Sequence, residues 1–466
     1  MKITRRRFLK VTTATVAAFP TIIPRHVLGG PKFVPPSEKI NLAIIGVGGQ
    51  GRTNLKALLP YADAQVIAIA DPAQHWDLTP FYYKGEAGRG PIRKMIEDHY
   101  ASKTPNFKVA EFEDFRVMLE KEKAIDAVLC ATPDHVHAYA SVFAMRAGKH
   151  VFCEKPLTHN LWEARLVARV TRETGVATQM GNIGHSTEGI RQTVEYLHDG
   201  AIGAVREVHS WVPATRWNPT LHGKPAETPP IPAGFNWDLW IGPRPMRPYH
   251  SAYAPVTWRD YWTFGCGALG DFGCHDMDSP TWAFDLPAPE SVEVRPAGFG
   301  DAEIAPYGEI GYYQFPAHGQ WPAIKLTWYS GGLQPPRPDA LPEGASLPSR
   351  GVLFVGEKGV IQCGGAGGPP NIFPESLRAS YKTPAPTLVR SKGHHRDWLD
   401  AIKGGPAASA SFEYAARLTE ITLLGVLSLR MGGKKIYWDA ANLKAKGLPA
   451  ADAVIKESYR PGWEPA

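Results

Sequence analysis

The sequence predicts an α/β protein with two domains. An N-terminal doubly wound parallel sheet is expected over residues 39–182, and a C-terminal α+β domain over residues 183–466. An apolar segment runs directly into a glycine-rich turn, and strand-like segments then alternate with helical ones as far as residue 182. The chain of 466 residues is also too long for one compact core.

The first strand, residues 41–45, leads into a turn with G-x-G-x-x-G spacing. Gly46 permits the tight turn, Gly48 lets the backbone approach a pyrophosphate, and Gly51 allows helix and strand to pack closely. The helix that follows offers unpaired N–H groups to phosphates. Every residue of the turn is therefore expected to contribute to a cofactor site: Gly46, Val47, Gly48, Gly49, Gln50 and Gly51.

The second strand, residues 65–70, ends in Asp71, twenty residues after Gly51. At this distance a carboxylate can accept hydrogen bonds from ribose hydroxyls. A glycine motif alone can be an ordinary turn, but the flanking strands and the acid together predict dinucleotide binding. Asp71 also repels a 2′-phosphate, and Pro72 rather than an arginine follows it. We therefore expect NAD to be preferred over NADP.

Four more strands complete the first domain, at residues 107–111, 125–132, 149–153 and 176–180. Helices are expected at residues 91–100 and from Pro133 to Gly148. Another helix follows Asn160, which has capping-box spacing to Glu163, and Gly175 stands where a left-handed C-terminal residue is expected. This alternation predicts a parallel sheet.

The second domain gives a weaker signal. Strands are expected at residues 204–212, 309–315 and 323–328. Residues 214–260 are crowded with Pro, Trp and Tyr, which predicts an ordered excursion rather than a linker. Residues 333–350 and 364–387 are expected to be long surface loops.

The positive charge of the chain is concentrated at its N-terminus. The formal net charge is +6, and the first thirty residues contain no acid. They contain six basic side chains: Lys2, Arg5, Arg6, Arg7, Lys10 and Arg25. The remainder is therefore nearly neutral and offers no basic field that would attract nucleic acid.

The same segment has the pattern of an export signal. Residues 4–10 match the twin-arginine motif, and an apolar run over 11–24 is too short to span a bilayer permanently. We expect a signal peptide over residues 1–30, recognition by the twin-arginine export machinery, and a periplasmic or otherwise exported protein without a permanent membrane span. The alternative is a disordered basic tail. The five cysteines include no C-x-x-C pair, which argues against a disulfide framework or a metal site and fits folding in the reducing cytoplasm.

Lys155 stands between Glu154 and Pro156 at the carboxyl end of the fifth strand. Ligands bind at these strand ends in open α/β sheets. A lysine there can contact cofactor and substrate and donate to an oxygen as negative charge develops on it. The alternative is a surface lysine before a turn proline.

Asp271 and His275 are four residues apart and lie on one face of a predicted helix. Asp271 is expected to cap this helix, to orient His275 and to raise its basicity for proton transfer. The alternative is a capping Asp with a packed His. Asp276 and Asp278 have no assigned role and are expected to be solvated.

Several motifs follow one another in a specific order: the twin-arginine start, GVGGQG, ATPDHVHA, CEKPL, QMGNIGHS and GALGDFGCHDMD. In this order the sequence resembles the Gfo/Idh/MocA oxidoreductase family over nearly the whole mature chain. Residues 393–402 and 459–463 resemble exported members. The resemblance implies a Rossmann domain joined to an α/β domain with a large, mostly antiparallel sheet, assembled as a homodimer or homotetramer.

The resemblance also implies the site residues. The family's lysine in E-K-P and its D-x-x-x-H motif fall on Lys155, Asp271 and His275, which become the expected catalytic residues. Expected cofactor contacts beyond the glycine turn are Asp71, Thr132, Pro133, His137, Glu154 and Lys155, whereas His135 is a cofactor or structural contact. Expected substrate contacts are Asn182, His185, Arg259, Tyr261 and His275.

Hydride transfer between NAD(P) and a hydroxyl of a sugar, cyclitol or glycoside is the first functional hypothesis. His275 would take the hydroxyl proton and Lys155 would stabilise the alkoxide. The alternative is a redox-neutral glycoside hydrolase or lyase with tightly bound NAD, which an exported protein without free cofactor would favour. A scaffold without turnover is a third possibility. The insert at about 214–262 departs from the family and leaves the substrate open.

Overall fold

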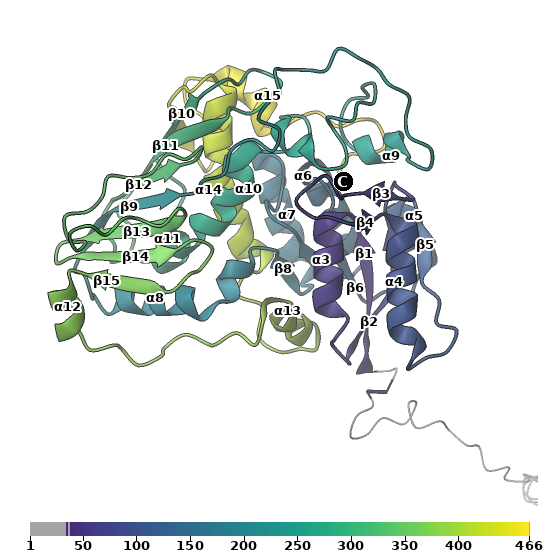
Figure 1. Cartoon of the computed structure of the whole chain (residues 1–466), viewed down its shortest axis with the longest axis horizontal. Coiled ribbons are helices and arrows are strands. Elements are labelled where there is room, and N and C mark those ends of the chain that lie inside the picture. Colours follow the sequence, from purple (N-terminus) through teal and green to yellow (C-terminus); the bar gives the residue numbers. More distant parts are fainter. Residues whose placement is uncertain (1–33, 36–37, 466) are drawn as a thin grey trace, which may run out of the picture.

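The N-terminal domain is a six-stranded parallel sheet in the order β5-β2-β1-β6-β7-β8 (Figure 1). The computed structural model describes residues 34–35 and 38–465, so the expected signal segment lies outside the described residues. The strands are β1 Ile40–Ile45, β2 Ala64–Ala70, β5 Ala110–Phe112, β6 Ala127–Cys130, β7 His150–Cys153 and β8 Thr178–Met180. The predicted doubly wound parallel sheet is confirmed.

Helices connect these strands as the alternating pattern predicted: α3 Gly49–Leu58, α4 Arg89–Ala101, α5 Phe115–Lys121, α6 Asp134–Arg146 and α7 Leu161–Thr174. The caps of α7 are also confirmed. The Asn160 side chain accepts a hydrogen bond from the Glu163 N–H at 3.0 Å, and the Glu163 carboxylate accepts from the Asn160 N–H at 3.2 Å. Gly175 ends the helix with φ of 65°. The chain therefore enters and leaves α7 at defined residues.

Two details of this domain differ from the prediction. β5 begins at Ala110 rather than at residue 107, because only Ala68–Ala70 of β2 pair with it. A small hairpin of β3 (Trp76–Asp77) and β4 (Glu86–Ala87) was not predicted, because strands of two residues are too short to show a period. This hairpin places the segment around Tyr83 beside the glycine turn.

The C-terminal domain is a nine-stranded sheet in the order β15-β14-β13-β9-β12-β11-β10-β16-β17. Its strands are β9 Val205–Trp211, β10 Ser291–Ala297, β11 Gly308–Phe315, β12 Ile324–Tyr329, β13 Gly351–Gly356, β14 Val360–Gly364, β15 Pro370–Phe373, β16 Ile436–Asp439 and β17 Lys444–Ala445. Neighbouring strands are antiparallel except β9 and β12. The expected mostly antiparallel sheet is confirmed.

The helices of this domain are α8 Glu188–His198, α9 Trp237–Ile241, α10 Gly267–Asp276, α11 Asp278–Ala283, α12 Glu375–Ser380, α13 His394–Ile402, α14 Phe412–Arg430 and α15 Asp452–Ile455. Residues 333–350 form the predicted loop. The second predicted loop, residues 364–387, instead contains β15 and α12, because this segment adds an edge strand to β14.

A continuous apolar core joins the two domains. Helix α14 packs against α7, α10 and β10, so it connects the Rossmann domain to the large sheet (Figure 1). Helix α13 returns to the other domain and places Trp398 and Leu399 against residues of α3 and α4. These contacts fix α10, which carries Asp271, relative to the carboxyl end of β7. Within the described part of the chain, no helix is long and apolar enough to cross a membrane.

The predicted excursion over residues 214–260 is ordered around its own aromatic cluster. The cluster includes Trp237, Trp240, Tyr253, Trp258, Tyr261 and Phe264. It contains α9 and a short 3-10 turn at Thr257–Asp260. We call residues 214–262 the insert; it packs over the edge of the Rossmann sheet, where Ala73 forms a β-bridge with Phe235.

Candidate active site

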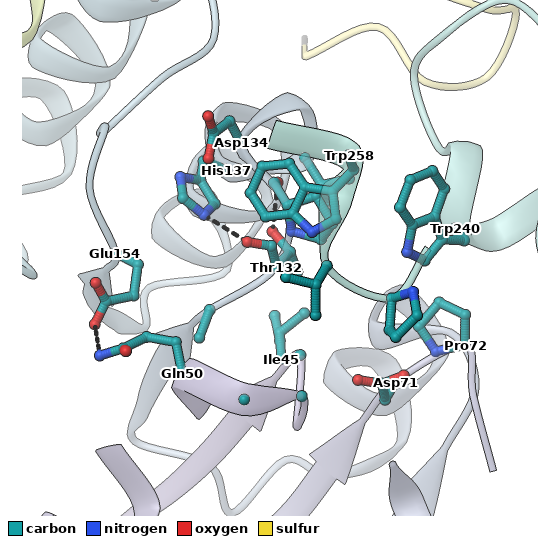
Figure 2. A pocket seen from close by; sticks show the side chains of 18 of the residues that line it. Ile45, Gln50, Asp71, Pro72, Thr132, Asp134, His137, Glu154, Trp240 and Trp258 are labelled. Carbon is teal, nitrogen blue, oxygen red and sulfur yellow. Dashed lines mark hydrogen bonds between the residues drawn. The ribbon is translucent and has the colours of Figure 1, made fainter. Parts of the chain in front are cut away.

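A cavity lies at the carboxyl ends of β1, β2, β6 and β7, where they meet the insert. Figure 2 shows Asp71, Pro72 and Trp240 on one side of it and Gln50 and Glu154 on the other. Most of the expected cofactor contacts line the cavity: Gly46, Gly48, Gly49, Gln50, Asp71, Thr132, Pro133, His137, Glu154 and Lys155. One site therefore brings together the glycine turn, the acid after β2 and the expected catalytic lysine.

The glycine turn has the geometry that a dinucleotide requires. Gly46 has φ of +83°, and a Cβ there would lie 2.6 Å from the carbonyl oxygen of Ala131. A Cβ on Gly51 would lie 1.9 Å from the Gly46 oxygen, which explains the close packing at this position. By contrast, a Cβ on Gly48 would meet nothing within 4 Å, and the N-terminus of α3 has no side-chain cap. The open turn and the free N–H groups therefore fit a pyrophosphate.

Asp71 is buried and held in one orientation. Its carboxylate accepts hydrogen bonds from the N–H groups of Val47 and Ala73, each at 2.8 Å. Burial raises the pKa of Asp71, against the effect of these two hydrogen bonds. Val47 and Gly51 support the turn from behind and do not line the cavity.

Lys155 and Asp271 form the polar centre of the cavity. The Lys155 ammonium makes an ion pair with the Asp271 carboxylate and donates to the Asp271 carbonyl oxygen at 2.9 Å. Burial opposes ionisation of Asp271, but the charges of Lys155 and Arg259 outweigh it and lower its pKa to about 2. Burial likewise lowers the pKa of Lys155, and Asp271 more than reverses this effect. Lys155 is therefore a charged donor rather than a base.

Two side chains of the insert complete the surroundings of Asp271. The Trp217 indole N–H donates to Asp271 Oδ2 at 3.2 Å, and the Arg259 Nε lies 3.7 Å from the same oxygen. The Arg259 guanidinium also lies over the Trp258 ring at 4.2 Å. Arg259 lines the cavity as expected. The insert therefore contributes directly to the electrostatics of the site.

The expectation that Asp271 caps the helix is wrong, because α10 begins at Gly267 and has Cys266 at its N-cap. Asp271 lies inside the helix, and its carboxylate contacts Lys155 rather than His275. Burial, followed by the charge of Lys155, lowers the pKa of His275 well below its ordinary value, opposite to the expected direction. Its Nδ1 is buried and has no hydrogen-bond partner within the described residues, and His275 does not line the cavity. His275 is therefore neutral near pH 7.

Asn182 and His185 do not line the cavity. Both are buried, and their side chains bond the Asp278 carboxylate at 2.9 Å. The expected solvation of Asp276 and Asp278 is wrong for the same reason: both are buried, and Asp276 pairs with Arg350 at 2.7 Å. These acids have partners distant in the sequence, which their spacing could not reveal.

Three other expected contacts have structural partners. Tyr261 is buried in the aromatic cluster of the insert, away from the cavity lining. The His137 ring nitrogens lie 2.7 Å from the Pro156 oxygen and 2.9 Å from the Thr132 oxygen, so His137 ties together two turns that line the cavity. His135 lies 3.0 Å from the Trp240 oxygen and anchors α9.

Sequence reasoning assigned no cofactor or substrate contact to several residues that line the cavity: Tyr83, Asp134, Trp240, Trp258 and Trp463. The Tyr83 ring packs on Gly49, where a Cβ would approach it to 2.2 Å. Burial, then the negative charge of Asp271, raises the pKa of Asp134 to about 7.

Asp134→Asn is expected to stabilise the protein more at pH 8 than at pH 5. The ordinary pKa of Asp134 is 3.8, and the folded protein holds the proton up to about pH 7. The folded state thus loses stability as pH rises through this window, and the asparagine does not. The free energy of unfolding of the variant, relative to that of the wild type, should rise by about 2–3 kcal/mol between pH 5 and pH 8. Thermal unfolding of both proteins across this range tests it, and a constant difference would contradict it.

Two family models match consecutive parts of the chain. One, described as "Oxidoreductase family, NAD-binding Rossmann fold", matches residues 91–182. The other, "Oxidoreductase family, C-terminal alpha/beta domain", matches residues 191–313. These matches correspond to the two domains described above.

Curated relatives match a shorter part of the chain. It is 29% identical over 171 residues to 2,7-anhydro-N-acetylneuraminate hydratase of Escherichia coli, which is 37% of this chain and 39% of that protein. It is 25% identical over 174 residues to levoglucosan dehydrogenase of Pseudarthrobacter phenanthrenivorans, which is 36% of this chain and 39% of that protein. The chain thus matches less than half the length of either relative.

Solved structures share the fold over most of the chain. The WlbA dehydrogenase of Bordetella pertussis, in complex with NADH and UDP-GlcNAcA, superposes with a TM-score of 0.57. The match covers 86% of this chain and 99% of that chain at 16% identity. At this identity the likeness establishes the fold alone.

Proposed function

Because this chain belongs to the Gfo/Idh/MocA oxidoreductase family, we propose that it transfers a hydride between NAD and a hydroxyl-bearing carbon of a sugar, cyclitol or glycoside. The observation that carries the proposal is the charged Lys155, held by Asp271 in the same cavity as the open glycine turn. Bound NAD would supply the hydride acceptor.

Three side chains have distinct roles in the proposed reaction. Lys155 is a fixed positive donor, and it stabilises the oxygen as its proton leaves and negative charge develops. Asp271 positions Lys155 and keeps it charged. His275, neutral and one turn of α10 after Asp271, is the proposed acceptor of the hydroxyl proton. The substrate loses one O–H and one C–H bond and gains a carbonyl.

A redox-neutral reaction is the second candidate. A ketone formed on the ring acidifies the neighbouring C–H bond, which permits elimination before the hydride returns to the sugar. Residues of the insert line the cavity and cover it, and this observation favours the redox-neutral route. A cofactor that the insert retains is not exchanged after each turnover, so it must be regenerated in place. The similarity to a hydratase of an anhydro sugar is consistent with it.

We also propose that the protein is exported by the twin-arginine route with its dinucleotide already bound. The twin-arginine motif at residues 4–10 supports export by this route. A bound dinucleotide would also stabilise the folded form by mass action before export. Protein recovered from a periplasmic extract is expected to yield nearly one equivalent of NAD(H) on denaturation. Protein that is empty, and active only with a continuous supply of free NAD, would contradict retention and favour an ordinary dehydrogenase.

A substrate screen separates the two chemical candidates. Purified protein is offered free sugars, cyclitols and aryl glycosides, while reduced nicotinamide and released aglycone are both followed. Net oxidation accumulates reduced cofactor with the first two classes. The redox-neutral route instead releases aglycone over many turnovers with no added cofactor. A protein that binds NAD but turns over none of these classes would contradict the proposed function.

NAD is expected to bind more tightly than NADP. The Asp71 carboxylate lies in the cavity, so a 2′-phosphate would meet its negative charge there. Asp71→Ala should reduce this preference by about tenfold, typical of one lost charged contact. Titration of both dinucleotides against wild type and variant measures it. Equal or tighter binding of NADP by the wild type would refute the assignment.

A further inference from the structure

The insert is fastened to the loop that follows Asp71. Ala73 and Phe235 form an antiparallel β-bridge. The Asn236 N–H donates to the Pro72 oxygen at 3.0 Å, and the Gln74 N–H donates to the Gly234 oxygen at 2.8 Å. The end of the cavity that carries the ribose-binding acid is therefore closed by backbone contacts from outside the Rossmann domain.

Helix α9 of the insert places Trp240 at this end. The side chain is buried and lines the cavity, and Figure 2 shows its ring beside Pro72 and near Asp71. The Trp240 carbonyl oxygen lies 3.0 Å from His135 Nε2 of α6. The indole is thus held at the adenosine end of the expected dinucleotide.

The C-terminal segment contributes a second indole. Trp463 is buried, lines the same cavity, and packs against the Tyr139 ring at 4.9 Å. The Arg116 guanidinium covers its ring at 4.0 Å. Arg460 ties this segment to α9 through Asp238 at 2.6 Å. The insert and the C-terminal segment therefore form one connected cover.

We propose that Trp240 and Trp463 bind the adenine half of the dinucleotide, and that the cover they belong to makes its release slow. The inference rests on the proposed NAD-dependent function. Every base has a π-face that an indole can contact without a specific hydrogen bond, and both indoles line the cavity. Because the cover is tied to the loop after Asp71, the dinucleotide can leave only after these contacts open.

Exchange of bound NAD for labelled NAD tests the inference on the holoprotein. Trp240→Leu and Trp463→Leu are each expected to speed release and to weaken binding of AMP by about 5- to 150-fold, the range for one lost base–indole contact. Binding of nicotinamide mononucleotide should not change. Trp321→Leu is the matched control, because this half-buried indole packs on Phe284 outside the cavity lining.

The outcomes distinguish failure of the proposed NAD-dependent function from failure of the proposed adenine contact. Wild type that binds no dinucleotide would refute the proposed function itself. If the wild type holds NAD and both leucine variants release it at the wild-type rate, only the inference is overturned. Binding of AMP and of nicotinamide mononucleotide that is weakened equally would overturn it too. If the leucine variants do not fold, Arg460→Gln leaves both indoles in place and should still speed release. Unchanged release from that variant would overturn the retaining role of the cover.

Discussion

Lys155→Ala is expected to lower turnover by about 10²–10⁴ while NAD stays bound. Lys155 forms the polar centre of the cavity with Asp271, and its loss removes the positive charge that stabilises the developing alkoxide. The fold should survive, because Asp271 keeps its contacts with Trp217 and Arg259. Turnover of the substrate found in the screen and NAD content after denaturation are both measured.

Lys149→Ala is the matched control for this prediction. Lys149 immediately precedes β7, at the end opposite Lys155, and donates to the Ile125 oxygen at 2.6 Å. Its removal should leave turnover close to the wild-type value. His275→Ala should resemble Lys155→Ala, because it removes the proposed proton acceptor. Near-full activity in either active-site variant would show that the assignment of roles is wrong.

Arg244→Met is expected to lower the free energy of unfolding by about 3–5 kcal/mol, the usual cost of breaking a buried ion pair by removing one partner. Arg244 is 2% exposed and pairs with Glu163 at 3.3 Å and with Glu457. The variant leaves both carboxylates buried with one cation fewer. The cluster of Arg244, Glu163 and Glu457 joins the insert to the start of α7 and to the C-terminal segment. The packing of all three segments should therefore weaken together.

Denaturant unfolding of the variant, compared with Arg169→Met, measures this effect. Arg169 pairs with Glu173, and both side chains are more than half exposed, so its loss should cost less than ~1 kcal/mol. The pKa of Glu457 lies below its usual range, despite burial, because of Arg244 and His159. The ionised Glu457 therefore contributes to the free energy of unfolding at neutral pH, and this contribution is lost only in acid. Equal stability of the two variants would contradict the cluster's role.

The cofactor half of the site could be predicted because its signals are local. The glycine turn and Asp71 lie on two successive strands, and the spacing between them is set by one helix. Gly46 has the positive φ, Gly48 the open space and Gly51 the close packing that the motif implies. Lys155 was found for a similar reason, since it is the second residue after a strand of the parallel sheet.

The substrate half could not be predicted to the same degree, because its contacts are distant in the sequence. After β8 a 3-10 turn at Ile183–Ser186 directs His185 onto Asp278, which lies 93 residues further along the chain. Asp271 meets Lys155 across 116 residues rather than His275 across four. In the cofactor half, the cover by Trp240 and Trp463 also depends on packing between segments that are distant in the sequence, which leaves no periodic pattern.

Transfer of a carbon-bound deuterium from substrate to bound nicotinamide is the most direct test of the central claim. The holoprotein is mixed with the substrate found in the screen, labelled at the reacting carbon, and quenched within one turnover for mass analysis of the cofactor. We expect one deuterium on the nicotinamide ring in the wild type and almost none in Lys155→Ala. Product formed by the wild type without deuterium ever entering the cofactor would contradict hydride transfer at this site.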